Sequence, residues 1–326
     1  MNIRAAILLF ASVAGAQPNS HLDQMERAVR SGQLKKITSV AVARGGKLVY
    51  ERYFEGDAAS LRNTRSASKT ITGMLVGIAI DRGALPNVNA PVMPFFGGEQ
   101  FQHPEPAKAQ ITIEDLLTMN SVLDCNDWVN TSPGNEDNMY PKRDWVKFAL
   151  DLPLRPARGF SYCTAGVVAL GSALERAVHM PVAEYARKNL FEPLGIERAK
   201  WTFSPSGQAM TGGGLELTTR DLVTLAGIYL NKGTWNGKKI LPAAWVETSV
   251  RPHMRIDDHT EYGYLWWIAT FGSQPAYYMT GNGGNKIVVF PKLDLVVAIT
   301  STNYNTRGMH EQTEKMLTDY ILPAVR

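Results

Sequence analysis

The sequence predicts an α+β fold, an α/β sandwich in which helices flank an antiparallel sheet built from both ends of the chain. β-rich runs occupy residues 37–54 and recur beyond residue 262, whereas most segments between them have helical periodicity. Residues 65–83 carry apolar side chains on nearly every face of a helix, which indicates a helix buried in the middle of the domain. We therefore expect a sheet completed by the C-terminal strands, with a mostly helical subdomain inserted between its two halves.

The first sixteen residues have the order of a secretory signal peptide. Arg4 precedes an apolar run that ends in the small residues Ala14 and Ala16, so we expect cleavage after Ala16 and an exported protein, periplasmic or secreted. No other stretch approaches 18 consecutive apolar residues, and no integral membrane span is predicted.

Residues 17–326 are expected to form a single domain. The 44% hydrophobic content of the chain is sufficient for one large core, and no internal repeat or low-complexity tract divides it. The sheet lobe should comprise about residues 30–65 and 255–326, and the inserted helical lobe about residues 84–200.

Local signals predict the individual elements. The runs at residues 37–44 and 47–54 should form a hairpin through Gly45-Gly46, and Thr112 can cap a short helix. Further helices are expected at residues 142–150, 164–178, 182–190, 218–230, 242–250 and 309–321, and further strands at 262–269, 276–281, 286–290 and 295–300.

Composition excludes several functions. The net charge is only +4 and no run of Lys and Arg exceeds two residues, so no nucleic-acid partner is predicted. The six histidines lack metal-ligand spacing and no glycine-rich phosphate loop is present, so we expect no metal and no cofactor. Gly-x-Ser-x-Gly and His-Glu-x-x-His are both absent, which leaves nucleophile-elbow hydrolases and zinc peptidases unsupported.

Residues 120–140 form a polar segment that is too long for a simple connection. The segment contains four carboxylates, which are Asp124, Asp127, Glu136 and Asp137. Their spacing matches no calcium-binding loop, so a solvated loop is favoured over an ion site.

Ser66 and Lys69 lie three residues apart at the start of the buried helix, on the same face. A serine hydroxyl becomes nucleophilic when a neighbouring base takes its proton, and a buried lysine in its neutral form can be that base. Ser-x-x-Lys also occurs by chance. In the alternative interpretation, Ser66 caps an ordinary core helix and Lys69 extends to water.

Three segments together resemble the serine hydrolases built like class C β-lactamases and low-molecular-mass penicillin-binding proteins. They are Ser66-Ala-Ser-Lys69, Phe160-Ser-Tyr162-Cys-Thr164-Ala-Gly166, and Gly281-Asn-Gly-Gly-Asn285 followed by Ile287-Val-Val-Phe-Pro291. The resemblance covers roughly residues 37–305 and implies a β-lactamase/transpeptidase-like fold and hydrolysis through an acyl-enzyme.

The resemblance also implies roles for individual residues. Ser66 is the expected nucleophile, Lys69 its partner, and Tyr162 the proton relay; a lysinium beside the phenol should lower the pKa of Tyr162 toward neutrality. Without the resemblance, Tyr162 would be taken for a core aromatic residue. The oxyanion hole should be formed by the backbone N–H groups of Ser66 and Asn282, and substrate should contact Thr164, Thr280 and Gly281.

Two positions depart from the pattern of the β-lactamases. Thr164 stands where they have asparagine, and Met279 stands where Lys-Thr-Gly would place a cation for a substrate carboxylate, although this register could shift by one or two residues. The pattern is closer to the related esterases and amide hydrolases, including enzymes that cut linear ω-amino-acid oligomers. The expected partner is a small-molecule or peptide-like ester or amide.

Two other functions stay open. A penicillin-binding DD-peptidase or weak β-lactamase would need a cation near Met279 from elsewhere in the fold. A catalytically silent member of the family that binds acyl ligands is compatible with Thr164 and Met279. The identity of the substrate and the oligomeric state do not follow from the sequence.

Cys125 and Cys163 are the two cysteines of the chain. In an exported protein they are expected to form a disulfide, with two free buried thiols as the alternative. A disulfide would hold the 120–140 loop against Tyr162.

Overall fold

The computed structural model describes residues 20–103 and 105–325. The predicted signal peptide of residues 1–16 lies outside the described residues. Within the described part of the chain, no helix has both the length and the apolar character needed to cross a membrane.

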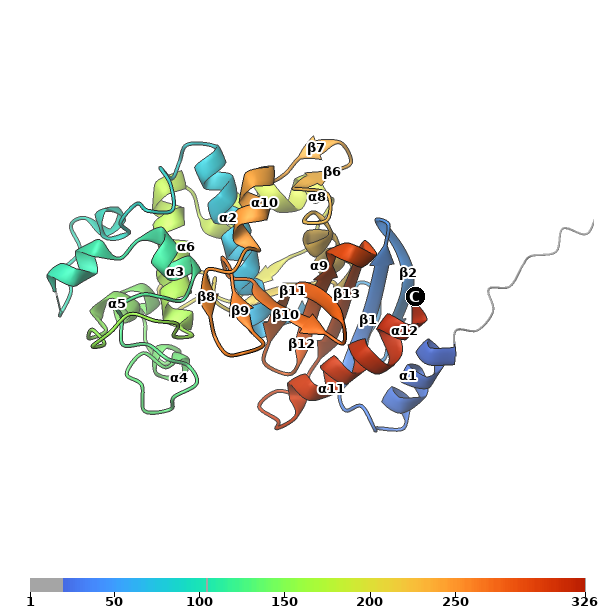
Figure 1. Ribbon diagram of the computed structural model, residues 1–326. Helices are drawn as coiled ribbons and strands as arrows, with labels where there is room; N and C mark the ends of the chain where they lie inside the picture. The colour runs from blue at the N-terminus through green and yellow to red at the C-terminus, as the bar shows by residue number, and fades with distance from the viewer. Residues whose placement is uncertain (1–19, 104, 326) are drawn as a thin grey trace, which may run out of the picture.

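An antiparallel sheet of eight strands forms the centre of the molecule (Figure 1), in the order β2-β1-β13-β12-β11-β10-β9-β8. β1 from the N-terminal part pairs with the C-terminal β13, with Val40 opposite Ile299, as the sequence predicts. The strands are β1 (Ile37–Arg44), β2 (Lys47–Tyr53), β8 (Met254–Arg255), β9 (Glu261–Tyr262), β10 (Trp267–Phe271), β11 (Gln274–Gly281), β12 (Asn285–Phe290) and β13 (Leu295–Ser301).

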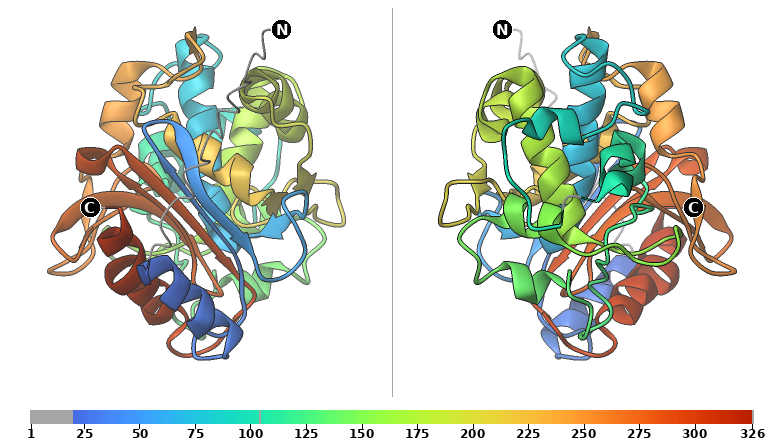
Figure 2. Two further views of the ribbon diagram at one scale, coloured as in Figure 1. Left: turned by 90° about the vertical axis from the view of Figure 1, so that its right-hand side faces the viewer. Right: turned by 90° about the vertical axis from the view of Figure 1, so that its left-hand side faces the viewer.

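Helices cover both faces of this sheet (Figure 2). One face packs against α1 (Ser20–Arg30), which the sequence analysis missed, and against the C-terminal α11 (Met309–Lys315), η6 (Met316–Ile321) and α12 (Leu322–Ala324). The other face packs against α2 (Lys69–Asp81) and α9 (Thr219–Gly227). Alternation along β12 divides its side chains between two cores, with Ile287 in one and Val288 in the other.

The central helix confirms the predicted burial, since every residue from Lys69 to Ala79 is buried. Its first turn differs from the prediction because η1 (Arg65–Ser68) is a 3-10 helix that leads into α2. A 3-10 helix has three residues per turn, so side chains three apart lie directly above one another. This geometry places Ser66 over Lys69.

The remaining elements form the helical part of the molecule and its connections. They are β3 (Arg62–Asn63), η2 (Met93–Phe96), η3 (Pro106–Gln110), α3 (Ile113–Leu117), α4 (Glu136–Met139), α5 (Trp145–Asp151), α6 (Thr164–Val178), α7 (Val182–Ala186), η4 (Arg187–Phe191), α8 (Glu192–Leu194), β4 (Lys200–Trp201), β5 (Leu215–Leu217), β6 (Thr234–Trp235), β7 (Lys238–Lys239), α10 (Ala243–Ser249) and η5 (Pro291–Leu293). Thr112 caps α3 as predicted, in a capping box with Asp115.

Three predicted elements differ from the structure. The helix expected at residues 142–150 begins only at Trp145, because the Asp144 side chain caps it. The helix expected to end at residue 190 continues through a π-helical turn to Leu194 and ends at Gly195, whose φ of 75° is left-handed. The strand expected at residues 262–269 is instead two paired strands, because the chain turns at Leu265 (φ 58°).

Candidate active site

Lys69 is buried beside Ser66. Its side chain is 1% exposed, and its Nζ lies 2.8 Å from the Ser66 Oγ. The alternative in which Lys69 extends to water is therefore wrong. Ser66 makes no helix-capping bond either, since neither η1 nor α2 has a side-chain cap.

Two further acceptors hold the Lys69 amine. Nζ donates to the Thr164 Oγ1 at 2.8 Å and to the Gly212 carbonyl at 2.5 Å. With Ser66, these acceptors account for all three N–H groups of an ammonium. A neutral amine could keep the bonds to Thr164 and Gly212 and turn its lone pair toward the Ser66 hydroxyl. The arrangement thus suits a base for Ser66.

Tyr162 is buried close to both residues: the Lys69 Nζ lies 4.8 Å from the centre of the phenol ring, and Ser66 is within side-chain hydrogen-bond range of Tyr162. Burial raises the pKa of Tyr162 above its ordinary value, and the opposing effects of Lys69 and Ser66 are smaller. The expectation that Lys69 would lower this pKa toward neutrality is therefore wrong. The resting site contains a neutral phenol, which can donate a proton.

The end of β11 lies directly against η1. A Cβ added to Gly281 would lie 2.0 Å from the Thr64 carbonyl oxygen and 2.9 Å from the Ser66 nitrogen. Glycine is the residue that permits this approach. The third motif and the nucleophile are therefore adjacent, as the predicted oxyanion hole requires. The following residue, Asn282, is held by its neighbours: its carbonyl accepts from the Asn285 side chain at 2.7 Å.

Gly281→Ala should damage both stability and activity, because the new methyl group meets backbone atoms that cannot rotate away. We expect a loss of about 2–4 kcal/mol in unfolding free energy and a fall in kcat of about 100-fold, since a displaced donor no longer meets the oxyanion. Denaturant unfolding and ester hydrolysis measure the two effects. Gly227→Ala in α9 is the matched control, because a Cβ there meets no atom within 4 Å. Unchanged kcat in Gly281→Ala would contradict the predicted donor site.

Met279 and Thr280 lie on opposite faces of β11, and neither offers a cation to a substrate. The Met279 side chain is fully buried in the core shared with α2, and the Thr280 hydroxyl donates to the Asn285 carbonyl at 2.9 Å. Lys286 lies opposite Thr280 in the strand register, but its ammonium pairs with Glu314 at 2.7 Å on the α11 side of the sheet. This lysine therefore does not replace the cation that Met279 lacks. The contact of Thr280 with substrate stays a prediction.

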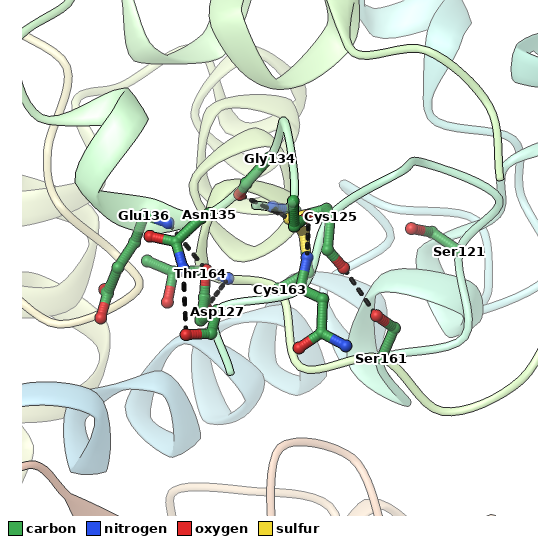
Figure 3. Close-up of a disulfide and its surroundings, with 12 residues drawn as sticks. Ser121, Cys125, Asp127, Gly134, Asn135, Glu136, Ser161, Cys163 and Thr164 are labelled. Carbon is green, nitrogen blue, oxygen red and sulfur yellow. Dashed lines mark hydrogen bonds between the residues drawn. A yellow bond between two sulfur atoms is a disulfide. The ribbon is translucent and has the colours of Figure 1, made fainter. Parts of the chain in front are cut away.

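Cys125 and Cys163 form the predicted disulfide (Figure 3), and the alternative of two free thiols is wrong. The bond joins the 120–140 loop to the residue between Tyr162 and Thr164. Within this segment, Asp127 contacts the catalytic region, since its backbone N–H donates to the Tyr162 carbonyl at 2.8 Å. Among the described residues, no group of three or more His, Cys, Asp or Glu side chains could hold a metal ion.

Reduction of this disulfide should impair activity more than the fold. The bridge closes a segment with a sequence separation of 38, for which loop-closure entropy suggests about 4 kcal/mol of stability. The strands of the central sheet and the helices α2 and α9 all lie outside the closed segment of residues 125–163, whereas Tyr162 is adjacent to Cys163. We expect at least a tenfold loss of ester hydrolysis after treatment with dithiothreitol, with the far-ultraviolet circular dichroism preserved. Equal activity before and after reduction would refute this expectation.

Aromatic side chains form one wall beside the tyrosine. The Trp128 ring stacks on the Tyr162 ring, with centroids 5.5 Å apart and planes 7° apart, and 56% of Trp128 stays exposed. Trp267 lies 5.6 Å from Tyr162, and Phe160 lies 5.7 Å from Trp128. Trp128 thus leaves an apolar ring exposed beside Tyr162.

Sequence reasoning missed two groups of this site. Gly212 acts through its backbone carbonyl, for which the sequence carries no side-chain signal. Asp127 could have been found, because it lies two residues after Cys125, and the predicted disulfide already placed that loop beside Tyr162.

An antiparallel sheet with helices on both faces and a serine–lysine pair packed against its strand β11 define the class of active-site serine hydrolases related to β-lactamases. The family described as Beta-lactamase matches residues 23–318. The chain therefore belongs to this family, and it is a serine hydrolase.

Individual relatives agree with this assignment. The 6-aminohexanoate-dimer hydrolase of Paenarthrobacter ureafaciens is 26% identical over 306 residues, which cover 85% of this chain and 76% of the relative. Two solved structures share the fold. A putative 6-aminohexanoate-dimer hydrolase from Bacillus anthracis has a TM-score of 0.75 at 20% identity. The match covers 90% of this chain and 80% of that chain. A class C β-lactamase from Rhodobacter sphaeroides has a TM-score of 0.71 at 16% identity. The match covers 94% of this chain and 100% of that chain.

Proposed function

We propose that this protein is an exported hydrolase that cleaves a linear amide or ester through an acyl-enzyme on Ser66. The observation that carries the proposal is the 2.8 Å contact between the Ser66 Oγ and the buried Lys69 Nζ, with Tyr162 against the same amine. A nucleophile in hydrogen-bond contact with a base, which other groups hold in place, is the arrangement that covalent catalysis needs.

In the proposed mechanism, the neutral Lys69 amine accepts the Ser66 proton while the Oγ attacks the substrate carbonyl carbon. The N–H groups of Ser66 and Asn282 stabilise the oxyanion. Tyr162 gives its phenolic proton to the leaving amine or alkoxide and recovers a proton from Lys69. The bond to the leaving group breaks and an acyl-Ser66 ester remains. Water then attacks this ester with the proton transfers reversed, which releases the acid and restores the serine.

The substrate class is proposed from the relatives and from the site. Two relatives are named as 6-aminohexanoate-dimer hydrolases, and the buried Met279 does not supply the cation that would bind a carboxylate beside the reacting carbonyl. The aromatic wall of Trp128, Phe160 and Trp267 suits a chain of methylene groups. These features favour a linear ω-amino-acid amide over a β-lactam or a D-amino-acid peptide.

Export is proposed from two independent features. The first sixteen residues have the order of a signal peptide, and the Cys125–Cys163 disulfide is of the kind that persists in oxidising compartments. A periplasmic or secreted location satisfies both.

Intact mass spectrometry tests the proposed function. The mature, unreduced protein is mixed separately with p-nitrophenyl butyrate, the linear 6-aminohexanoate dimer and benzylpenicillin, and Ser66→Ala is treated in parallel. We expect a short-lived acyl adduct from the ester, hydrolysis of the dimer, and neither in the variant. A long-lived penicilloyl adduct would favour a penicillin-binding protein, and no reaction with any compound would favour a silent binding protein.

A further inference from the structure

We propose that Asp127 is a positioning residue, whose carboxylate holds the Tyr162–Thr164 segment so that both side chains meet Lys69. The inference rests on the proposed function of Ser66, Lys69 and Tyr162. Asp127 itself lies outside the predicted catalytic set, on the 120–140 loop.

Asp127 contacts this segment at two points, and Figure 3 shows the one at Thr164. Its backbone N–H donates to the Tyr162 carbonyl at 2.8 Å, and its Oδ2 accepts from the Thr164 N–H at 2.7 Å. The two bonds lie on either side of Cys163, whose disulfide fixes the same segment to the loop. The two hydrogen bonds of Asp127 and the disulfide together fix the positions of Tyr162 and Thr164.

The second oxygen of the carboxylate fixes Asp127 itself. Oδ1 accepts from the Glu136 N–H at 2.9 Å, so both oxygens are engaged by backbone donors. An asparagine has only one side-chain oxygen and cannot make both bonds. Asp127→Asn would keep the size of the side chain, remove its charge, and leave one of the two N–H groups opposite an NH2 group.

The carboxylate is also linked to the base. Thr164 is the first residue of α6, its N–H donates to Asp127, and its hydroxyl accepts from Lys69. The charged groups that act on Asp127 are Lys69, which favours the ionised acid, and Glu136, which opposes it. A displacement of the Asp127 carboxylate would therefore also displace the Thr164 hydroxyl, which orients the Lys69 amine.

The charge of Asp127 destabilises the fold while it serves the site. Burial raises the pKa of Asp127 to about 6, from an ordinary value near 4. Between these values the folded protein holds a proton that the unfolded chain has lost, so stability falls as the pH rises from about 4 to 6 and stays lower above that range.

The test compares Asp127→Asn with Asp137→Asn, which removes one charge from an exposed position of the same loop. Burst acylation of Ser66 by p-nitrophenyl butyrate is followed from pH 5 to 8. We expect the wild-type rate to fall below about pH 6 as Asp127 is protonated. Asp127→Asn should acylate 10- to 100-fold more slowly at pH 8, without this acid limb, and Asp137→Asn should match the wild type within twofold.

Unfolding measurements separate positioning from a structural role. The wild type should lose stability between pH 4 and 7 relative to Asp127→Asn, so a slow but stable variant supports the proposal. A wild-type rate that is flat from pH 5 to 8, a variant that acylates normally, or a rate loss matched by unfolding would each overturn it. Failure of the proposed function would give a different result from failure of the Asp127 proposal, because the wild type itself would then form no acyl adduct on Ser66.

Discussion

Ser66→Ala should lower kcat/KM for ester and amide substrates by about five orders of magnitude, since removal of a catalytic serine leaves only the binding and oxyanion contributions. The neighbouring serine, Ser68, is not placed for this role, because its hydroxyl donates to the Arg65 carbonyl at 2.9 Å. No acyl adduct should form on the variant. Stopped-flow hydrolysis and intact mass spectrometry measure both effects.

Ser68→Ala is the matched control for this prediction. It removes the other hydroxyl of Ser66-Ala-Ser-Lys69 from a more deeply buried position. We expect its kcat/KM to stay within about tenfold of the wild type, with a loss of about 1 kcal/mol in stability from the missing hydrogen bond. A Ser66→Ala variant that retains more than one hundredth of the activity would place the nucleophile elsewhere.

Local signals explain why so much of the fold could be predicted from the sequence. The hairpin turn needs positive φ at two positions, and Gly45 and Gly46 supply it with φ of 56° and 70°. The capping boxes of Thr112 and Thr218 begin α3 and α9. In each case the residues that decide the structure are neighbours in the chain, so the sequence pattern is sufficient.

Features that depend on distant parts of the chain could not be predicted in this way. The turn at Leu265 has a left-handed φ on a residue type that does not signal one, and its N–H bonds to the carbonyl of Leu117, which is remote in sequence. Gly212 contributes a carbonyl to Lys69 across 143 positions of sequence. Such contacts are made by the tertiary fold, and residue types do not encode them.

The pKa of Tyr162 illustrates the same limit for chemistry. Sequence reasoning placed a lysine beside the phenol and predicted a lower pKa from the charge alone. The structure adds burial, which penalises the phenolate and outweighs Lys69. A preformed phenolate is therefore not available, and the proposed mechanism gives the task of accepting the Ser66 proton to Lys69.

Lys69→Met tests that assignment and should lower kcat/KM by about two to four orders of magnitude, the range for loss of a general base. The methionine fills a similar volume but cannot accept the Ser66 proton. Its effect on stability should be small, within about 2 kcal/mol, because relief from burying an amine offsets the donor lost to the Gly212 carbonyl. Steady-state kinetics and thermal unfolding measure the two quantities.

Lys69→Arg separates a base from a fixed positive charge. A guanidinium can donate to Thr164 and Gly212 but stays protonated in proteins, so it cannot take the Ser66 proton. If Lys69 is the base, the arginine variant should be nearly as inactive as the methionine variant, although it keeps the charge. If Lys69 served only to lower the pKa of the Tyr162 phenol, the arginine should restore much of the activity. Near-equal loss in both variants is the expected result, because a neutral amine at Nζ could keep one N–H on Thr164 and one on Gly212 and turn its lone pair toward the Ser66 hydroxyl, which a guanidinium cannot do.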